Sequence, residues 1–116
     1  MRISILALMF FGFVVSANAN EIRGAGASTC GTWLQYRISK EKFAELFAEL
    51  HLHWIQGFIS SYNQFVYTGR NPDGIFGSVD SKSIAAWMDN YCRAKPLDTV
   101  YQGTLVLVEE LKRRAD

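Results

Sequence analysis

The sequence has few of the residues that metal sites and nucleic-acid-binding surfaces need. Two cysteines, two histidines and two prolines occur among 116 residues, and 12 basic side chains are nearly balanced by 11 acidic ones. Phosphate binding depends on clustered positive charge, so this balance argues against nucleic acid as the main partner. The chain also lacks internal repeats, low-complexity tracts and any convincing alternation of polar and apolar residues. These absences leave one small domain without a strand signal.

The one long apolar run stands at the N-terminus. Arg2 precedes the mostly apolar residues 3–15, and Ala-Asn-Ala at residues 17–19 places small side chains where a signal peptidase reads them. A membrane-spanning helix needs roughly 20 apolar residues, so the run is too short for a retained anchor. We therefore expect residues 1–19 to be a cleaved signal peptide and residues 20–116 to be a periplasmic or secreted domain with no membrane span.

Both cysteines, Cys30 and Cys92, lie in the mature part of the chain. Exported chains fold in an oxidising compartment, where two such cysteines usually pair. The alternatives are a catalytic thiol and a zinc site completed by His51 and His53. On a helix the His-x-His spacing points the two rings about 200° apart, which makes joint ligation awkward. A disulfide is favoured, and closing a loop of about 60 residues contributes on the order of 4 kcal/mol.

Caps and apolar spacing predict an all-α fold, a small four-helix domain stapled by one disulfide. The helices are expected over about residues 30–37, 40–66, 81–95 and 97–114. A Gly-rich loop over residues 68–79 joins the second helix to the third, and its Asn-Pro-Asp-Gly sequence is a turn signal. Residues 20–27 contain two glycines and no periodicity, so we expect them to form a flexible lead-in.

The longest predicted helix carries an apolar stripe that we expect to face the core. Its members follow the spacing of one helical face: Phe43, Leu46, Phe47, Leu50, Trp54, Phe58, Tyr62 and Val66. His51 and His53 are expected at the helix surface. Gly57 and Gly103 are small residues where a second helix can cross closely. The last helix is expected to bury a similar set: Leu97, Val100, Tyr101, Leu105, Val108 and Leu111.

No combination of residues forms a convincing catalytic or cofactor motif. None of the serines lies in the strand–turn–helix motif of a catalytic nucleophile. The side chains of the adjacent Glu109 and Glu110 point in different directions on a helix, so these two carboxylates cannot act together in one site. Asn71 and Asp73 have the spacing of calcium-loop ligands, but the later ligands of such a loop are missing. We therefore expect no enzyme activity, no cofactor and no metal.

Aromatic residues at the end of the second predicted helix are the candidate partner-binding residues. Tyr62, Phe65, Tyr67 and Phe76 cluster where the apolar stripe runs out into the Gly-rich loop, so fewer helical neighbours remain to cover them. Loops often carry function, and aromatic rings commonly carry interface energy. The alternative is that the loop folds back and buries these rings.

Short motifs resemble those of known exported families. Residues 28–34 and 84–111 resemble the two halves of the HdeA-like periplasmic acid-stress chaperones, and this resemblance implies a disulfide between Cys30 and Cys92. The segment between the cysteines is longer here, and the Lys-rich polar character of those chaperones is missing.

Two further likenesses involve other segments. Residues 54–58 and 91–96 resemble the periplasmic Tai-type immunity proteins, which neutralise secreted amidase toxins. The motifs Cys-Gly-x-Trp-Leu, Trp-x-x-Gly-Phe-x-Ser-x-Tyr-Asn and Asp-Asn-Tyr-Cys, from residues 30, 54 and 89, are together similar to those of short exported proteobacterial proteins of unknown function.

These resemblances imply a domain that binds other periplasmic proteins. The leading hypothesis is HdeA-like protection of such proteins. Low pH favours this activity, because protonation of the carboxylates raises the net positive charge of the domain, and the resulting self-repulsion opens its helices. An alternative is an immunity-type inhibitor of one exported enzyme, and another is a structural component of the envelope. Self-association into a homodimer is compatible with each of the three.

The cleavage site can be checked directly. We expect the exported protein to begin at Asn20, because the small residues at positions 17 and 19 satisfy the peptidase. Mass spectrometry of the intact periplasmic protein gives the first residue. A protein that keeps residues 1–19 in the membrane fraction would contradict the prediction.

Overall fold

The computed structural model describes residues 20–115 of the chain. Within this range it has no strand, and it contains one short 3₁₀ turn and four α-helices: η1 (Gly24–Ala27), α1 (Cys30–Ile38), α2 (Ala44–Phe65), α3 (Ser81–Ala94) and α4 (Val100–Ala115). The predicted all-α, four-helix fold is confirmed. The signal peptide predicted over residues 1–19 lies outside the described residues, so its cleavage stays a prediction.

Three of the four α-helices begin at side-chain caps, and only α2 has no such cap. Thr29 caps α1 by accepting a hydrogen bond from the Thr32 amide, and Asp80 caps α3 in the same way from the Ser83 amide. At the start of α4, the Thr99 hydroxyl accepts a hydrogen bond from the Gln102 amide, and the Gln102 side-chain oxygen accepts one from the Thr99 amide. This reciprocal pair is a capping box. This box starts α4 at Val100 and not at residue 97 as predicted.

Two of the predicted boundaries differ from the observed ones for a local reason. The second helix was expected to begin at residue 40, but the Ser39 hydroxyl accepts from the Glu41 amide at 3.1 Å and closes a turn, so α2 begins only at Ala44. Leu97 was expected to be buried in the last helix. It lies in the turn between α3 and α4 and is 93% exposed.

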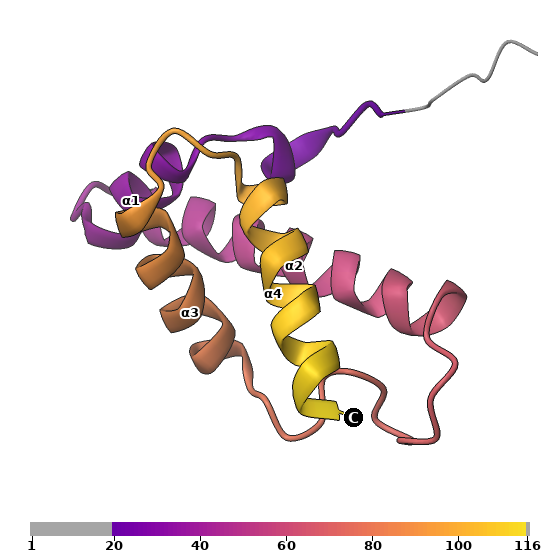
Figure 1. The fold of residues 1–116 in the computed structure, drawn as a ribbon. Helices are drawn as coiled ribbons and strands as arrows, with labels where there is room; N and C mark the ends of the chain where they lie inside the picture. Colours follow the sequence, from indigo (N-terminus) through magenta and orange to yellow (C-terminus); the bar gives the residue numbers. More distant parts are fainter. Residues whose placement is uncertain (1–19, 116) are drawn as a thin grey trace, which may run out of the picture.

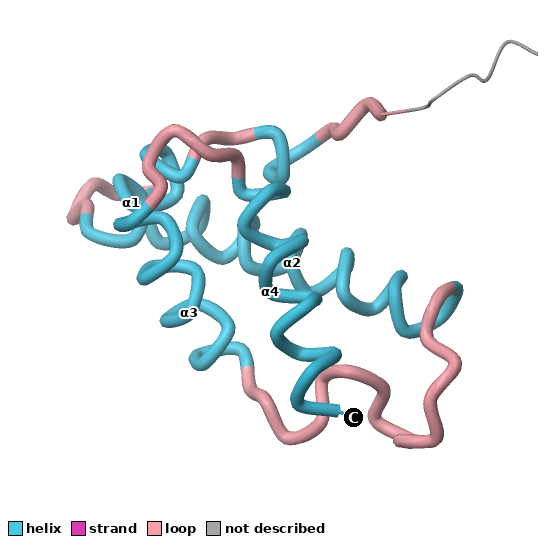
Figure 2. The backbone as a smooth tube through the Cα atoms, viewed as in Figure 1, coloured by secondary structure: helices cyan, strands magenta, loops and turns pink. Residues whose placement is uncertain are grey.

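The helices form two groups that cross each other. α3 and α4 run antiparallel as a hairpin, and this hairpin lies across α2 (Figure 1). α1 packs against both α2 and α3. The loop after α2 returns beneath the C-terminal end of α4 before it enters α3, so it closes the open end of the hairpin (Figure 2).

The predicted disulfide is present and lies at the other end of the hairpin. Cys30 and Cys92 are bonded, both are fully buried, and they join the start of α1 to the end of α3. Backbone hydrogen bonds surround them: the Cys30 amide donates to Asp98 O at 2.7 Å, and the Val100 amide donates to Ser28 O at 2.8 Å. The disulfide therefore holds α1, α3 and the start of α4 together.

The turn between α3 and α4 is held by a partly buried polar contact. The Tyr91 hydroxyl donates to the Asp98 carboxylate at 2.5 Å. Burial, and after it this hydrogen bond, raises the pKa of Tyr91 to about 12. Close to this turn the two helices touch at Gly103, where a Cβ atom would lie 2.8 Å from the Met88 methyl group. The close crossing predicted at Gly103 is confirmed.

Two other predictions about glycines are wrong. No atom lies within 4 Å of a Cβ built on Gly57, so no helix crosses there. The lead-in is also not flexible: Gly26 packs so closely on the Trp54 ring that any Cβ would overlap it. The Trp54 indole donates to Arg23 O at 3.1 Å and fixes the lead-in to α2.

The disulfide generates a prediction about stability. Cys30→Ser and Cys92→Ser should each lower the free energy of unfolding by about 4 kcal/mol, because either change frees the long loop in the unfolded state. Urea unfolding followed by circular dichroism measures the loss, and reduced wild-type protein is the control. Two reactive thiols in the unreduced wild-type protein would contradict the prediction.

Candidate functional site

α2 carries two apolar faces, and only one of them is buried. The buried face is made of small and branched side chains: Ala44, Ala48, Leu52, Ile55 and Ile59. A second row at helical spacing faces solvent, and we call it the outer stripe: Phe43, Leu46, Phe47 and Leu50, exposed by 54, 54, 42 and 50%. The expectation that these four side chains face the core is therefore wrong.

The rest of the predicted stripe is covered only in its middle. Trp54 stacks on Phe58 with ring centroids 5.6 Å apart, and Tyr101 of α4 meets both rings edge-on. The lead-in packs over Trp54 from outside. At the far end Val66 is 57% exposed. Because the lead-in and α4 cover only this central part, the four side chains before it remain open to solvent.

A groove borders the outer stripe on the side of α1. Its volume is about 240 Å³, and Tyr36, Phe43 and Phe47 supply its aromatic lining. The rings of Tyr36 and Phe47 lie 5.1 Å apart. Phe43 and Phe47 belong to both the groove and the outer stripe, so the two features adjoin each other.

His51 lies beneath this surface and not at the helix surface as expected. Only 6% of it is exposed, and its ring lies 5.5 Å from Tyr36 and 6.2 Å from Trp33. Its Nδ1 donates to Phe47 O at 2.7 Å, while Nε2 is buried without a hydrogen-bond partner. His53 is exposed, as expected.

The zinc alternative finds no support at these histidines. Both cysteines are in the disulfide. Within residues 20–115, no group of three or more His, Cys, Asp or Glu side chains is placed to hold a metal ion.

A polar contact between α1 and α3 keeps the wall of the groove in place. Asp89 accepts from the Trp33 indole at 2.8 Å and from the Nε and Nη2 atoms of Arg37 at 3.0 and 2.9 Å. These bonds to Asp89 raise the pKa of Arg37. Arg37 also lies over the Trp33 ring, 5.5 Å from its centroid. α1 is thus fixed by this contact at its middle and by the disulfide at its start.

The four aromatic residues predicted to bind partners do not form one exposed patch. Phe65 is 83% exposed, whereas Tyr62, Tyr67 and Phe76 are half-buried and pack against the core. The Tyr67 hydroxyl accepts from the Asn71 amide at 3.1 Å and so anchors the loop. Phe65 remains a candidate contact, while the other three rings hold the loop in place.

The sequence contained one signal for the outer stripe that the prediction missed. Ala44, Ala48, Leu52, Ile55 and Ile59 also recur at helical spacing. A helix with two such rows can bury only one of them against a small core. Small and branched residues allow the close approach that a compact core requires, so the bulky row stays outside.

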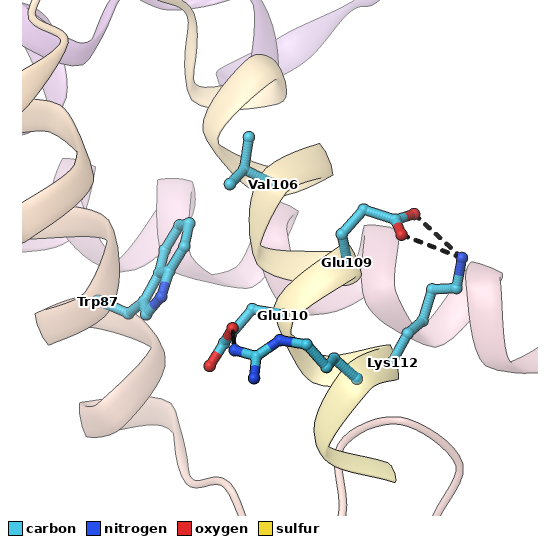
Figure 3. A pocket seen from close by; sticks show the side chains of 6 residues that line it. Trp87, Val106, Glu109, Glu110 and Lys112 are labelled. Carbon is cyan, nitrogen blue, oxygen red and sulfur yellow. Dashed lines mark hydrogen bonds and ion pairs between the residues drawn. The ribbon is translucent and has the colours of Figure 1, made fainter. Parts of the chain in front are cut away.

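Another groove, with a volume of about 600 Å³, lies between α3 and α4. Figure 3 shows Trp87 projecting from α3 toward α4, where Glu109 pairs with Lys112 at 3.0 Å. Glu110 pairs with Arg114 and Arg113, and these hydrogen bonds hold its pKa below the usual value. Ion pairs therefore line the edge of this groove, and the lowered pKa of Glu110 is the opposite of the raised pKa that a general acid needs.

The assignment of the buried and exposed faces of α2 can be tested by making the same Leu→Gln substitution once on each face. Leu46→Gln should change the free energy of unfolding by less than about 0.5 kcal/mol, because the side chain is exposed. Leu52→Gln puts the same amide into the core and should cost more than about 2 kcal/mol. Chemical unfolding of both variants measures the difference. Equal losses would contradict the assignment of the faces.

Comparisons with known proteins do not place this chain in a family. No family model, no curated protein and no solved structure matches it. None of the helices within residues 20–115 is long and apolar enough to cross a membrane. The resemblance to HdeA-like and Tai-type proteins rests on short motifs, so a function must be argued from the outer stripe and its groove.

Proposed function

We propose that this chain is an exported protein-binding domain that holds an apolar segment of another exported protein on the outer stripe. The single observation that carries the proposal is the exposure of Phe43, Leu46, Phe47 and Leu50 on one side of α2. Small soluble proteins rarely leave a contiguous apolar patch open unless it binds something.

The surroundings of the outer stripe support this function. Lys42 and Glu49 are exposed beside it, which gives the apolar centre and polar rim typical of protein interfaces. The aromatic groove beside it offers a place for one large apolar side chain of the partner. Phe and Tyr are also among the side chains enriched at such interfaces.

The rigidity of the site supports it as well. The disulfide and the Asp89 contact fix α1 against α3, so the α1 wall of the groove is in place before a partner arrives. A preformed surface loses less conformational entropy on binding than a surface that must first be ordered. Binding in this form does not require the domain to unfold.

HdeA-like protection is the form of this function that we favour. An exposed apolar row can bind apolar segments of many different sequences, as a protective chaperone must. This function also agrees with the motif resemblance at residues 28–34 and 84–111. Acid enhances such binding on general grounds, because below about pH 4 the carboxylates of unfolding clients and of this domain are largely protonated.

A second function is favoured by one specific observation. The groove beside the outer stripe has a defined volume of about 240 Å³ and fixed walls, and a shaped cavity suits one complementary side chain. This geometry supports an immunity-type inhibitor that binds a single exported enzyme at neutral pH. Selective binding of one protein distinguishes it from promiscuous protection.

The proposal predicts the outcome of a binding assay with the exported protein. Leu46→Gln combined with Leu50→Gln should weaken capture of periplasmic proteins at pH 7 and suppression of client aggregation at pH 4. Loss of two central apolar contacts typically lowers affinity by at least about tenfold. Pulldown with mass spectrometry and light scattering of model clients provide the two readouts.

Leu97→Gln is the matched control, because Leu97 is equally apolar, more exposed and outside the outer stripe. Phe65→Ala tests the other end of α2. If wild-type protein captures nothing and protects no client, only a structural role in the envelope is left. If Phe65→Ala alone removes binding, the site is at the loop.

A further inference from the structure

The groove between α3 and α4 lies apart from the outer stripe and has no part in the function proposed above. Its wall on the α3 side is Trp87, and α4 contributes Val106, which is 45% exposed. Figure 3 shows Trp87 on one side of the groove and Val106 and Glu110 on the other. Four charged side chains of α4 line the rest: Glu109, Glu110, Lys112 and Arg113. A volume of about 600 Å³ gives room for a small ligand.

Trp87 differs from the two other tryptophans in what its ring meets. The indoles of Trp33 and Trp54 each donate a hydrogen bond to a protein oxygen, at 2.8 and 3.1 Å. The Trp87 ring is only partly buried, and within residues 20–115 its indole donates to no protein atom. The ring stacks on Tyr91, with centroids 5.5 Å and planes 12° apart, which fixes its orientation. The groove therefore has an aromatic wall whose donor the domain does not use.

The charges that line the groove compensate each other. Glu109 pairs with Lys112 at 3.0 Å. Glu110 pairs with Arg113 and, at 2.7 Å, with Arg114. The four charged residues that line the groove are two of each sign, so a charged ligand would be attracted by one member of each pair and repelled by the other. The groove therefore favours a neutral ligand.

A purely apolar ligand does not suit the groove either. Its apolar wall consists only of Trp87 and Val106, and such a ligand would take water from the charged groups without replacing the hydrogen bonds, which costs free energy. A hydroxyl group, by contrast, both donates and accepts. It can donate to a carboxylate and accept from the neighbouring cation at the same time, so it binds to an ion pair without breaking it.

A sugar ring combines a polar edge with an apolar face. Its hydroxyl groups lie around the edge, and the C–H bonds of its face pack flat on an aromatic ring. We propose that the groove between α3 and α4 binds a neutral oligosaccharide, with one sugar ring against Trp87 and its hydroxyls on the Glu110–Arg113 ion pair. The proposal does not rest on the function proposed above, because the outer stripe lies on α2.

The test is the binding of two neutral probes to residues 20–116, measured by isothermal titration calorimetry at neutral pH. The probes are the tetrasaccharides of N-acetylglucosamine and of glucose, and at least one of them should bind. Sedimentation with insoluble peptidoglycan then distinguishes the sources: retention on the pellet indicates the glycan of the cell wall, and its absence indicates free oligosaccharides. Failure to bind either tetrasaccharide overturns the proposal.

Two substitutions assign the binding to this groove. Trp87→Leu should raise the Kd of the bound tetrasaccharide by at least about tenfold, because it removes the ring against which the sugar packs. Glu110→Ala should raise it by at least about fivefold, because it removes a charged acceptor. Glu110 lies on the surface of α4, so this variant keeps the test valid if Trp87→Leu fails to fold. Wild-type affinity in Glu110→Ala overturns the proposal.

Glu21→Ala is the matched control. Glu21 also pairs with an arginine, Arg23 at 2.9 Å, but it belongs to the lead-in and does not line the groove. Its removal should leave the Kd within about twofold of the wild-type value. In NMR spectra of the wild-type protein, the indole N–H signal of Trp87 should shift on titration, while those of the other two tryptophans should stay in place. A shift at Trp54 instead of Trp87 overturns the assignment of the site and leaves the outer stripe unaffected.

Discussion

The Cys30–Cys92 disulfide is the constraint on which the rest of the structure depends. A domain of fewer than 100 residues buries too little apolar surface for a large margin of stability, and a covalent link adds an amount comparable to the margin itself. The link joins the start of α1 to the end of α3, and the backbone bonds around it bring in the start of α4. Three of the four helices are therefore held at one end of the molecule.

That constraint explains how α2 can leave a bulky apolar row in solvent. With α1, α3 and α4 held around the disulfide, the core needs from α2 only a narrow face on which they can pack closely. Ala48, Ile55 and Ile59 provide it. Phe43 and Phe47 are too large to lie in that layer, because interiors are packed at near-crystalline density and tolerate little excess volume. The row that the core excludes is the surface that we propose to bind other proteins.

Much of the fold was predictable because its causes are local. Thr29 and Asp80 satisfy amides only a few residues away, and Pro96 stops α3 through its own ring. The disulfide was predictable because the sequence predicts export, and two cysteines in an oxidising compartment usually pair. The boundary errors at Ser39 and Leu97 came from competing local bonds, where a turn and a capping box replaced the expected helical starts.

The sequence by itself determined that the chain is helical, that α1 and α3 begin at side-chain caps and which cysteines pair, since the helices and caps depend on neighbours in the chain and the chain has only two cysteines. Only the tertiary structure decided which apolar face of α2 is buried, that His51 lies under Tyr36, and that the lead-in covers Trp54. Helical periodicity shows that a face is apolar but not what it meets. The choice between two apolar faces depends on the volume that the other helices leave, and that volume exists only once they have packed.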